Sequence, residues 1–161
     1  MRWFEDIEIG MYWDLGSYCF TEAEILRFAR KFDPQYFHVD PERATAGPYG
    51  GLIASGWHTV AIWMKRMVAS RPVANEAPDG RRPAAGPSPG FLDLKWPNPV
   101  RPGDTIHFST TVTEKLELPH RPNFGLIRSR NEGVNQRGEP VLSFIGQGMV
   151  ERRDTIAKDR E

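Results

Sequence analysis

An aspartate and a histidine stand five positions apart in the segment FDPQYFHVDP, at residues 32–41. Asp33 and His38 are residue types that exchange protons near neutral pH, because an imidazole beside a carboxylate can accept a proton or release one. Asp33 precedes Pro34, and a residue before proline is pushed out of the helical region. Both side chains are therefore expected on irregular backbone after a helix, where they can converge on one point.

A glycine-rich segment, YGGLIASGWHT at residues 49–59, leads into an apolar run that continues to Val68. The run is apolar nearly all round, and its first charged residues are Lys65 and Arg66. This pattern is typical of a helix that is buried on most of its surface. The start of a helix presents free N–H groups and the positive end of the helix dipole, which favour negative charge.

The elements that position these two segments can be predicted from capping signals and periodicity. Residues 12–20 are strand-like, and Thr21 followed by Glu24 forms a capping box that begins a helix. Asp40 and Pro41 predict the cap and the first residue of a second, short helix. The first helix carries an apolar stripe at i, i+3, i+4 and i+7, made by Ile25, Phe28, Ala29 and Phe32.

The second half of the chain predicts an antiparallel sheet. Alternating apolar residues and turn signals place strands at about 91–96, 106–112, 125–134 and 140–150, with a hairpin turn at 135–138. Residues 69–90 hold five prolines and three glycines without any period, which predicts a long loop. We expect an α+β fold in which a sheet wraps around one long apolar helix. A single domain over residues 1–152 with a charged tail at 153–161 fits the length of 161 residues.

Composition excludes several classes of function. Lysine plus arginine and aspartate plus glutamate balance at 21 each, which removes the positive field that nucleic-acid binding needs. The single cysteine, Cys19, excludes an intrachain disulfide, and four scattered histidines do not indicate a metal site. The apolar run is too short to span a bilayer, and the N-terminus has acids where a signal peptide needs an apolar core. We expect a reducing, cytoplasmic setting without membrane or nucleic-acid partners.

The order of the elements and both segments resemble the MaoC-like dehydratases, a branch of the hot-dog fold that includes the R-specific enoyl-CoA hydratases. The resemblance covers residues 4–150 and is carried by Asp33 with His38, by GGLIASGWHT, and by PVRPGD at residues 99–104. It implies a hot-dog fold whose subunits pair through their sheets, so a homodimer or a higher homo-oligomer is expected.

The resemblance also implies an activity and a set of site residues. The reaction is the addition or removal of water at the double bond of a trans-2-enoyl-CoA, with the CoA thioester as substrate and no further cofactor. In that family the matching aspartate and histidine orient and activate one water molecule, which gives these parts to Asp33 and His38. The backbone N–H of Gly56 matches the family's oxyanion donor, and a helix start suits it. Ser55, Trp57 and Tyr36 flank these residues and are the expected substrate-binding positions.

Some residues in and near the two segments depart from the family pattern. Others are interpreted as packing residues without a part in the reaction. Tyr36 stands where many hydratases carry a proline, and the bulky Trp57 after Gly56 predicts a reshaped acyl pocket. His58 is interpreted as a hydrogen-bonded core or interface residue rather than a catalytic base. The large apolar residues of the run are interpreted as core packing, namely Trp57, Trp63, Met64 and Met67.

Two other functions stay open on the sequence. The hot-dog fold also hosts thioesterases, since fold alone does not decide chemistry. Thioesterases of this fold generally use an acidic residue on or near the central helix, and no Asp or Glu lies between Tyr49 and Met67. A non-catalytic module that binds acyl thioesters is the second alternative, because the string from Asp33 to His38 departs from the usual pattern.

Overall fold

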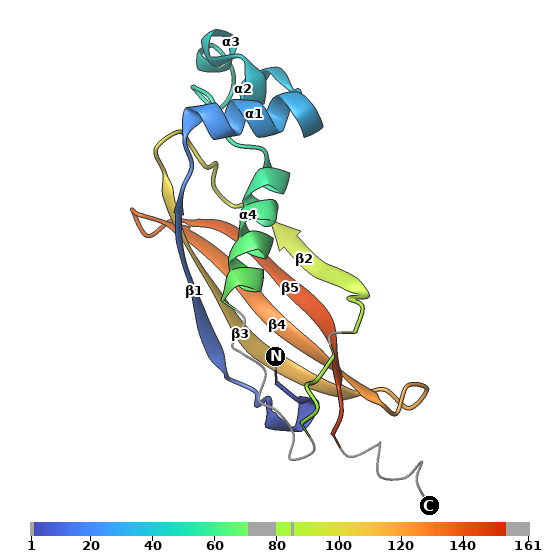
Figure 1. Cartoon of the computed structure of the whole chain (residues 1–161). Coiled ribbons are helices and arrows are strands. Elements are labelled where there is room, and N and C mark those ends of the chain that lie inside the picture. Colours follow the sequence, from blue (N-terminus) through green and yellow to red (C-terminus); the bar gives the residue numbers. More distant parts are fainter. Residues whose placement is uncertain (1, 71–79, 85, 154–161) are drawn as a thin grey trace, which may run out of the picture.

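Five strands form one antiparallel sheet in the computed structural model, which describes residues 2–70, 80–84 and 86–153. The order of the strands across the sheet is β1-β3-β4-β5-β2, so β1 and β2 are the edges (Figure 1). The predicted α+β architecture with an antiparallel sheet is confirmed. The strands are β1 (Tyr12–Cys19), β2 (Gly90–Lys95), β3 (Thr105–Glu117), β4 (Phe124–Asn135) and β5 (Pro140–Glu151).

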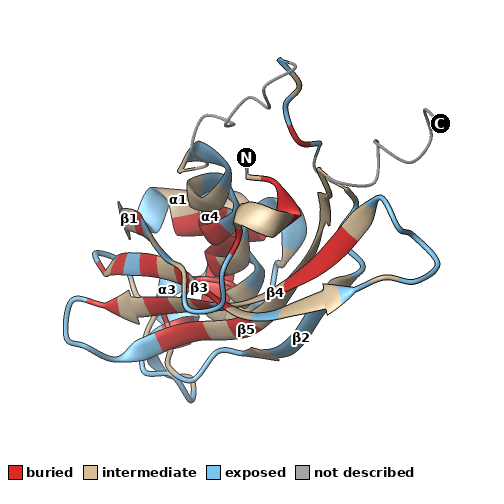
Figure 2. Cartoon of the chain, turned by 90° about the horizontal axis from the view of Figure 1, so that it is seen from below, coloured by how far each residue is buried: buried red, intermediate tan, exposed pale blue. Residues whose placement is uncertain are grey.

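Buried and more exposed residues alternate along the strands, so one face of the sheet is turned towards the core (Figure 2). On β3 the buried residues are Ile106, Phe108, Thr110 and Val112, so every second side chain points at the core. The predicted hairpin between β4 and β5 is also present, and Gly138 adopts φ +81°, a left-handed conformation that favours glycine. The predicted positions of the strands are therefore confirmed, although β3 extends to Glu117, beyond its predicted end at residue 112.

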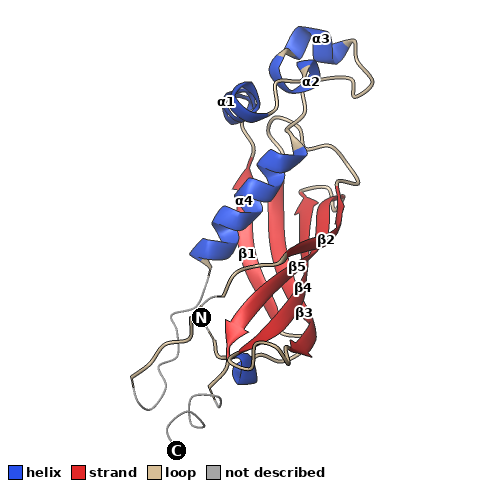
Figure 3. Ribbon diagram, turned by 90° about the vertical axis from the view of Figure 1, so that its right-hand side faces the viewer, coloured by secondary structure: helices blue, strands red, loops and turns tan. Residues whose placement is uncertain are grey.

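Three short helices cover one end of the sheet, and a longer helix lies across one of its faces (Figure 3). The predicted capping box is confirmed, because Thr21 and Glu24 each accept a hydrogen bond from the other's backbone N–H. The Asp40 side chain caps the third helix by accepting from the Arg43 N–H at 3.1 Å, as predicted. The helices are α1 (Glu22–Phe32), α2 (Tyr36–Val39), α3 (Pro41–Thr45) and α4 (Gly56–Ala69), with a 3-10 turn at Phe4–Asp6.

Two helix predictions were wrong in detail. The segment around His38 is a single helical turn, α2, rather than irregular backbone, because one turn is too short to leave a period in the sequence. Helix α4 is not buried on most of its surface, since the sheet covers only one of its sides. The side chains of Trp57, Met64 and Val68 are 52%, 49% and 54% exposed, so Trp57 and Met64 are not core residues within this chain.

The predicted loop and tail are described only in part. Residues 71–79 and 85 of the loop at 69–90, and residues 154–161 of the tail, lie outside the described residues. The described loop residues 80–84 and 86–89 contain no helix or strand. The Gly86 N–H donates to the Met149 carbonyl at 3.0 Å, which holds this part of the loop beside β5.

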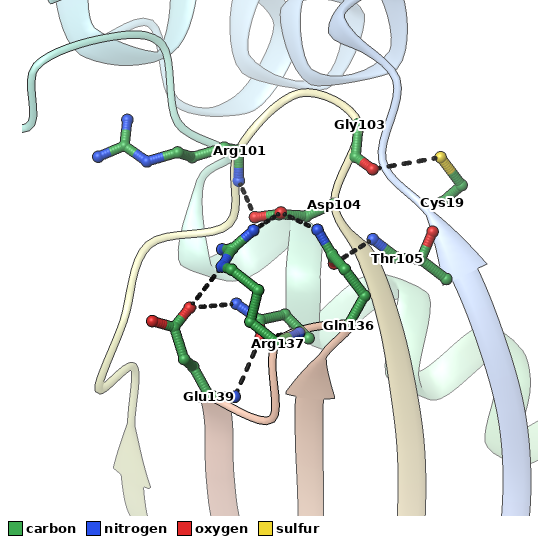
Figure 4. Close-up of polar contacts among 9 residues, drawn as sticks. Cys19, Arg101, Gly103, Asp104, Thr105, Gln136, Arg137 and Glu139 are labelled. Atoms are coloured by element: carbon green, nitrogen blue, oxygen red, sulfur yellow. Dashed lines mark hydrogen bonds and ion pairs between the residues drawn. The ribbon is translucent and has the colours of Figure 1, made fainter.

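A buried carboxylate joins the PVRPGD turn to the hairpin between β4 and β5 (Figure 4). Asp104 is 3% exposed and accepts hydrogen bonds from the Arg101 N–H at 2.8 Å, from Gln136 at 2.8 Å and from Arg137 at 2.9 Å. Burial alone would raise the pKa of Asp104, but these donors more than offset it and hold the pKa below its usual range. The turn therefore has a structural function in the fold.

We expect Asp104→Asn to lower the free energy of unfolding by about 2 kcal/mol at neutral pH, because the amide leaves part of a buried donor set unsatisfied. Urea unfolding measures this difference. Glu139→Gln is the matched control, since Glu139 contacts the same Arg137 from a half-exposed position and its loss should be clearly smaller. Equal losses in the two variants would show that the buried carboxylate is not the stabilising centre of this network.

Candidate active site

Asp33 lies at the point where α1 ends and is the centre of the polar contacts at that end of the sheet. It is the C-cap residue of α1, with φ −152° and ψ 71°. Its Oδ2 atom accepts a hydrogen bond from the Ser55 hydroxyl at 2.7 Å, and its Oδ1 atom accepts from the Gln35 amide at 2.9 Å. The structure thus orients the carboxylate from both sides.

His38 faces the same carboxylate from α2. The His38 side chain is buried, and its Nε2 atom lies 3.4 Å from Asp33 Oδ2. Its Nδ1 atom lies 2.8 Å from the Ile53 carbonyl oxygen, which can only accept a hydrogen bond. Nδ1 therefore carries the proton, and in the neutral ring the lone pair of Nε2 is directed towards Asp33. The two residues predicted to act together do converge.

The surroundings of Asp33 keep its carboxylate ionised. Burial alone would raise the pKa of Asp33, but the hydrogen bonds from Ser55 and Gln35 and the neighbouring His38 offset this and lower the pKa below its usual value. When the His38 ring is neutral, the site presents two acceptors side by side, a carboxylate oxygen and an imidazole nitrogen. A water molecule between them would donate one hydrogen to each.

Ser55 and Gly56 place the start of α4 beside this pair. Ser55 is the N-cap of α4, and its hydroxyl oxygen accepts from the Trp57 N–H at 3.3 Å while its hydrogen is donated to Asp33. Gly56 is the first residue of α4, so its N–H has no partner within the helix. The structure brings Asp33, His38, Ser55 and the Gly56 backbone together.

An indole ring lies where a side chain at Gly56 would be. A Cβ atom added to Gly56 would come within 2.5 Å of the Trp96 ring, whose N–H donates to the Gly56 carbonyl at 3.1 Å. The glycine is therefore required by the close approach of Trp96. Sequence reasoning missed this neighbour and treated Trp96 only as part of an alternating strand, because no local signal links residues 40 positions apart.

Tyr36 and Trp57, the other two predicted substrate-binding residues, make their side-chain contacts away from the Asp33 carboxylate. The Tyr36 ring packs against the guanidinium of Arg43 at 5.0 Å, and its hydroxyl lies beside Gly47. Tyr36 is thus directed towards α3 and the turn after it. Trp57 is half-exposed and packs edge-on against Trp96, with ring centroids 5.5 Å apart. A substrate contact for either residue stays a prediction.

His58 is a core residue, as its apolar setting predicts. Its ring stacks on Phe28 with centroids 4.6 Å apart and meets Phe20 edge-on at 5.0 Å. The predicted hydrogen bond is not seen, since the buried Nδ1 atom has no partner in the described part of the chain. Burial disfavours the charged ring and lowers the pKa of His58 to about 4.

The described residues contain neither a cluster of metal ligands nor a membrane-spanning helix. Within residues 2–70, 80–84 and 86–153, no three His, Cys, Asp or Glu side chains gather as metal ligands would. None of the helices in the same ranges has the length and apolar character needed to cross a bilayer.

Comparison with known proteins connects this geometry to a family. A family model described as MaoC like domain matches residues 8–123. The chain belongs to the MaoC-like family. The MaoC-like dehydratase from Rhodospirillum rubrum superposes with a TM-score of 0.81 and 38% identity, covering 94% of this chain and 97% of that one. The predicted family and hot-dog fold are confirmed.

Relatives of the MaoC-like chain include hydratases and dehydratases. YdeM of Bacillus subtilis, whose function is uncharacterized, is 32% identical over 138 residues, which are 86% of this chain and 91% of YdeM. Mesaconyl-CoA hydratase from Cereibacter sphaeroides is 40% identical over 68 residues, which are 42% of this chain and 20% of that enzyme. R-Hydratase PhaJ1 from Pseudomonas aeruginosa shares the fold, with a TM-score of 0.67 at 20% identity over 94% of this chain and 86% of that one.

We expect the buried His58 of this MaoC-like chain to make the fold sensitive to acid. The unfolded chain binds a proton at the ordinary histidine pKa of about 6.5, whereas the folded chain does so only near pH 4. Stability is therefore complete above about pH 6.5 and falls as the pH drops towards 4, by an amount on the order of 3 kcal/mol. His58→Phe should lose less stability over this interval in denaturant titrations. Parallel losses in the two proteins would exclude His58 as the group responsible.

Proposed function

We propose that this chain is a hydro-lyase that adds water to, or removes it from, the double bond of a trans-2-enoyl thioester, with CoA as the thiol. The observation that supports this most is the convergence of Asp33 and His38, both as acceptors, beside the start of α4. Addition to a conjugated thioester needs a base for the water, a proton donor for the α-carbon and a donor for the thioester oxygen. These residue types and positions provide all three.

The reaction can be written with the atoms of this site. Water donates one hydrogen to Asp33 and one to His38 Nε2, which leaves an oxygen lone pair directed at the β-carbon. The O–C bond forms as one of the two acceptors takes a proton, and the electrons of the double bond move to the thioester oxygen. The Gly56 N–H stabilises that negative charge. The proton then passes to the α-carbon, which restores the carbonyl, and dehydration is the reverse sequence.

The relatives support the thioester as substrate. One is a mesaconyl-CoA hydratase, and another is 3-hydroxyacyl-thioester dehydratase Z from Mycobacterium tuberculosis, 51% identical over 43 residues that are 28% of that protein. Both names describe water chemistry on acyl thioesters. Because these matches span small parts of those enzymes, they support the class of reaction rather than the acyl group.

The two alternatives have less support. Thioesterases of this fold generally use an acidic residue on or near the central helix, and α4 itself, Gly56–Ala69, contains none. A binding module without catalysis would not need an ionised carboxylate held against a histidine lone pair. Its signature would be CoA ester binding that survives replacement of either residue, with no turnover of any enoyl thioester.

We expect Asp33→Asn and His38→Asn each to lower kcat by about 10²- to 10⁴-fold, which is the usual contribution of a general base. The asparagine at position 38 can still donate to the Ile53 carbonyl, so the loss would report the missing base rather than a collapsed turn. The assay is the loss of enoyl-thioester absorbance over a panel of trans-2-enoyl-CoAs.

Matched controls for these variants lie on the sheet. Asp14 and His107 make the same kind of contact at the same distance, 3.4 Å, but are far more exposed, with 61% and 45% of their side-chain surfaces accessible. Asp14→Asn and His107→Asn should keep the wild-type rate. Retained turnover in both site variants, or losses of similar size in the controls, would contradict the proposed mechanism.

The described surface supports a homodimer as the working form. Among the described strands, β2 pairs with β5 alone and is an edge of the sheet. Its Phe91 and Leu92 are 48% and 43% exposed, and the apolar face of α4 with Trp57, Met64 and Val68 is exposed as well. Pairing of two β2 edges would extend the sheet and cover these residues.

We expect Val68→Arg to convert a dimer into a monomer, because a buried unpaired charge at a two-fold contact is costly. An arginine near the end of α4 suits the helix dipole, so the fold should be kept. Light scattering coupled to size exclusion gives the mass of each form. Ala23→Arg, an exposed position on α1, is the control and should leave the mass unchanged. A wild-type protein that is monomeric at high concentration would overturn this arrangement.

A further inference from the structure

A chain of hydrogen bonds connects the end of β2 to the carboxylate of the candidate active site. It begins at the Trp96 indole N–H, which donates to the Gly56 carbonyl oxygen at 3.1 Å. The N–H of the same peptide group belongs to Trp57 and donates to the Ser55 hydroxyl oxygen at 3.3 Å. The Ser55 hydroxyl in turn donates to Asp33 Oδ2 at 2.7 Å. We call this chain of contacts, from Trp96 to Asp33, the Trp96 relay.

All the hydrogen bonds of the Trp96 relay point in the same direction. A donor on the oxygen of the Gly56–Trp57 peptide group polarises the N–H of that group towards its own acceptor. The Ser55 hydroxyl accepts with its oxygen and donates its hydrogen, so it passes the polarisation on. The relay ends on an ionised carboxylate, which forms stronger hydrogen bonds than a neutral acceptor does. Each contact therefore strengthens the next one on the way to Asp33.

Packing fixes the outer end of the relay. Trp96 directly follows β2, and its ring lies 2.5 Å from the position that a Cβ atom on Gly56 would take. The Trp57 ring packs edge-on against it, with centroids 5.5 Å apart. Trp96 is 41% exposed, whereas Ser55 at the inner end is 1% exposed. The relay therefore runs from a half-exposed indole to a hydroxyl from which solvent is excluded.

The inner end of the relay meets the groups that surround Asp33. Ser55 donates to Asp33 Oδ2, and Gln35 donates to the other carboxylate oxygen at 2.9 Å. His38 is the titratable side chain beside Asp33, and its Nε2 atom lies 3.4 Å from the same Oδ2. The direction of the Ser55 hydroxyl thus decides which side of Oδ2 is left for a water molecule that also contacts His38.

We propose that Trp96 is a positioning residue for the reaction, because through the relay it fixes the direction in which Ser55 holds the Asp33 carboxylate. This inference rests on the proposed hydro-lyase function, in which Asp33 and His38 share one water molecule. Trp96 contacts neither of these two side chains. Its effect reaches the water through the Gly56–Trp57 peptide group and the Ser55 hydroxyl.

The first test is Trp96→Phe, which removes the indole N–H and keeps an aromatic ring against Gly56. We expect kcat for trans-2-enoyl-CoAs to fall about three- to tenfold, which is the usual net contribution of a hydrogen bond expressed as a rate. KM should stay within about twofold, since no contact with the substrate is lost. An unchanged kcat, or a rise in KM alone, would overturn the proposal.

Trp3→Phe is the matched control for this variant. The Trp3 indole nitrogen is buried and has no hydrogen-bond partner in the described part of the chain. The N-terminus lies towards the opposite end of the sheet from α1, α2 and α3 (Figure 1). The same exchange of indole for phenyl should therefore leave kcat at the wild-type value. A loss of kcat equal to that of Trp96→Phe would overturn a specific function of the Trp96 N–H.

A double-mutant cycle distinguishes the relay from simple packing of Trp96 on α4. Ser55→Gly removes the hydroxyl and keeps a residue that is tolerated at a helix N-cap. In this background Trp96→Phe should cause no further loss of kcat, because the relay is already broken. The same loss in both backgrounds would show that Trp96 acts independently of Ser55 and would overturn the relay.

A measurement without turnover separates this inference from the proposed function. Labelling with [15N]tryptophan gives one amide and one indole signal for each of the five tryptophans. Asp33→Asn should move the Trp57 amide signal and the Trp96 indole signal, because it removes the charge on which the relay ends. In the Ser55→Gly background the same substitution should leave both signals in place. Asp14→Asn, which changes an exposed carboxylate, is the control and should move neither signal.

The two possible failures have different signatures. Movement of the same size with and without the Ser55 hydroxyl, or no movement in either protein, would overturn the relay even if the protein is an active hydratase. Signals that move only when Ser55 is present support the relay even if no enoyl-CoA is hydrated. In that case the proposed reaction alone is contradicted.

Discussion

The hydrogen bond from the Ser55 hydroxyl to Asp33 is the contact on which the candidate site depends. One side chain caps the start of α4 through its oxygen and orients the carboxylate at the end of α1 through its hydrogen. The geometry of the site is therefore not a property of either helix alone. Because Ser55 is 1% exposed, water does not compete for this contact, and the carboxylate stays ionised despite its partial burial.

The sheet packs against one side of α4 and leaves the other side exposed, and the two sides have different surroundings. Towards the sheet, a cavity of about 400 Å³ lies between α4 and the strands. Away from the sheet, apolar side chains are exposed next to the free edge of β2. Helix α4 therefore borders open space on one side and carries exposed apolar side chains on the other.

Two buried histidines of this chain, His58 and His38, have different chemical properties because their surroundings differ. His58 lies between aromatic rings, and burial outweighs the nearby charge of Glu24 and keeps the ring neutral. His38 is equally buried, but a carbonyl on one nitrogen and a carboxylate near the other give its ring a defined tautomer and direction. The chemistry of an imidazole is set by what contacts its two nitrogens.

The sequence by itself determined the local elements and the resemblance that led to Asp33, His38 and Gly56. Capping at Thr21 and Asp40, and the alternation of β3, depend on neighbours close in the chain, and such signals can be read directly. The exposure of one α4 face, the Trp96 ring over Gly56 and the cavity beside the sheet could not be read in this way. Only the tertiary structure decided them, because they arise from contacts between residues far apart in sequence, and local propensity carries no information about such contacts.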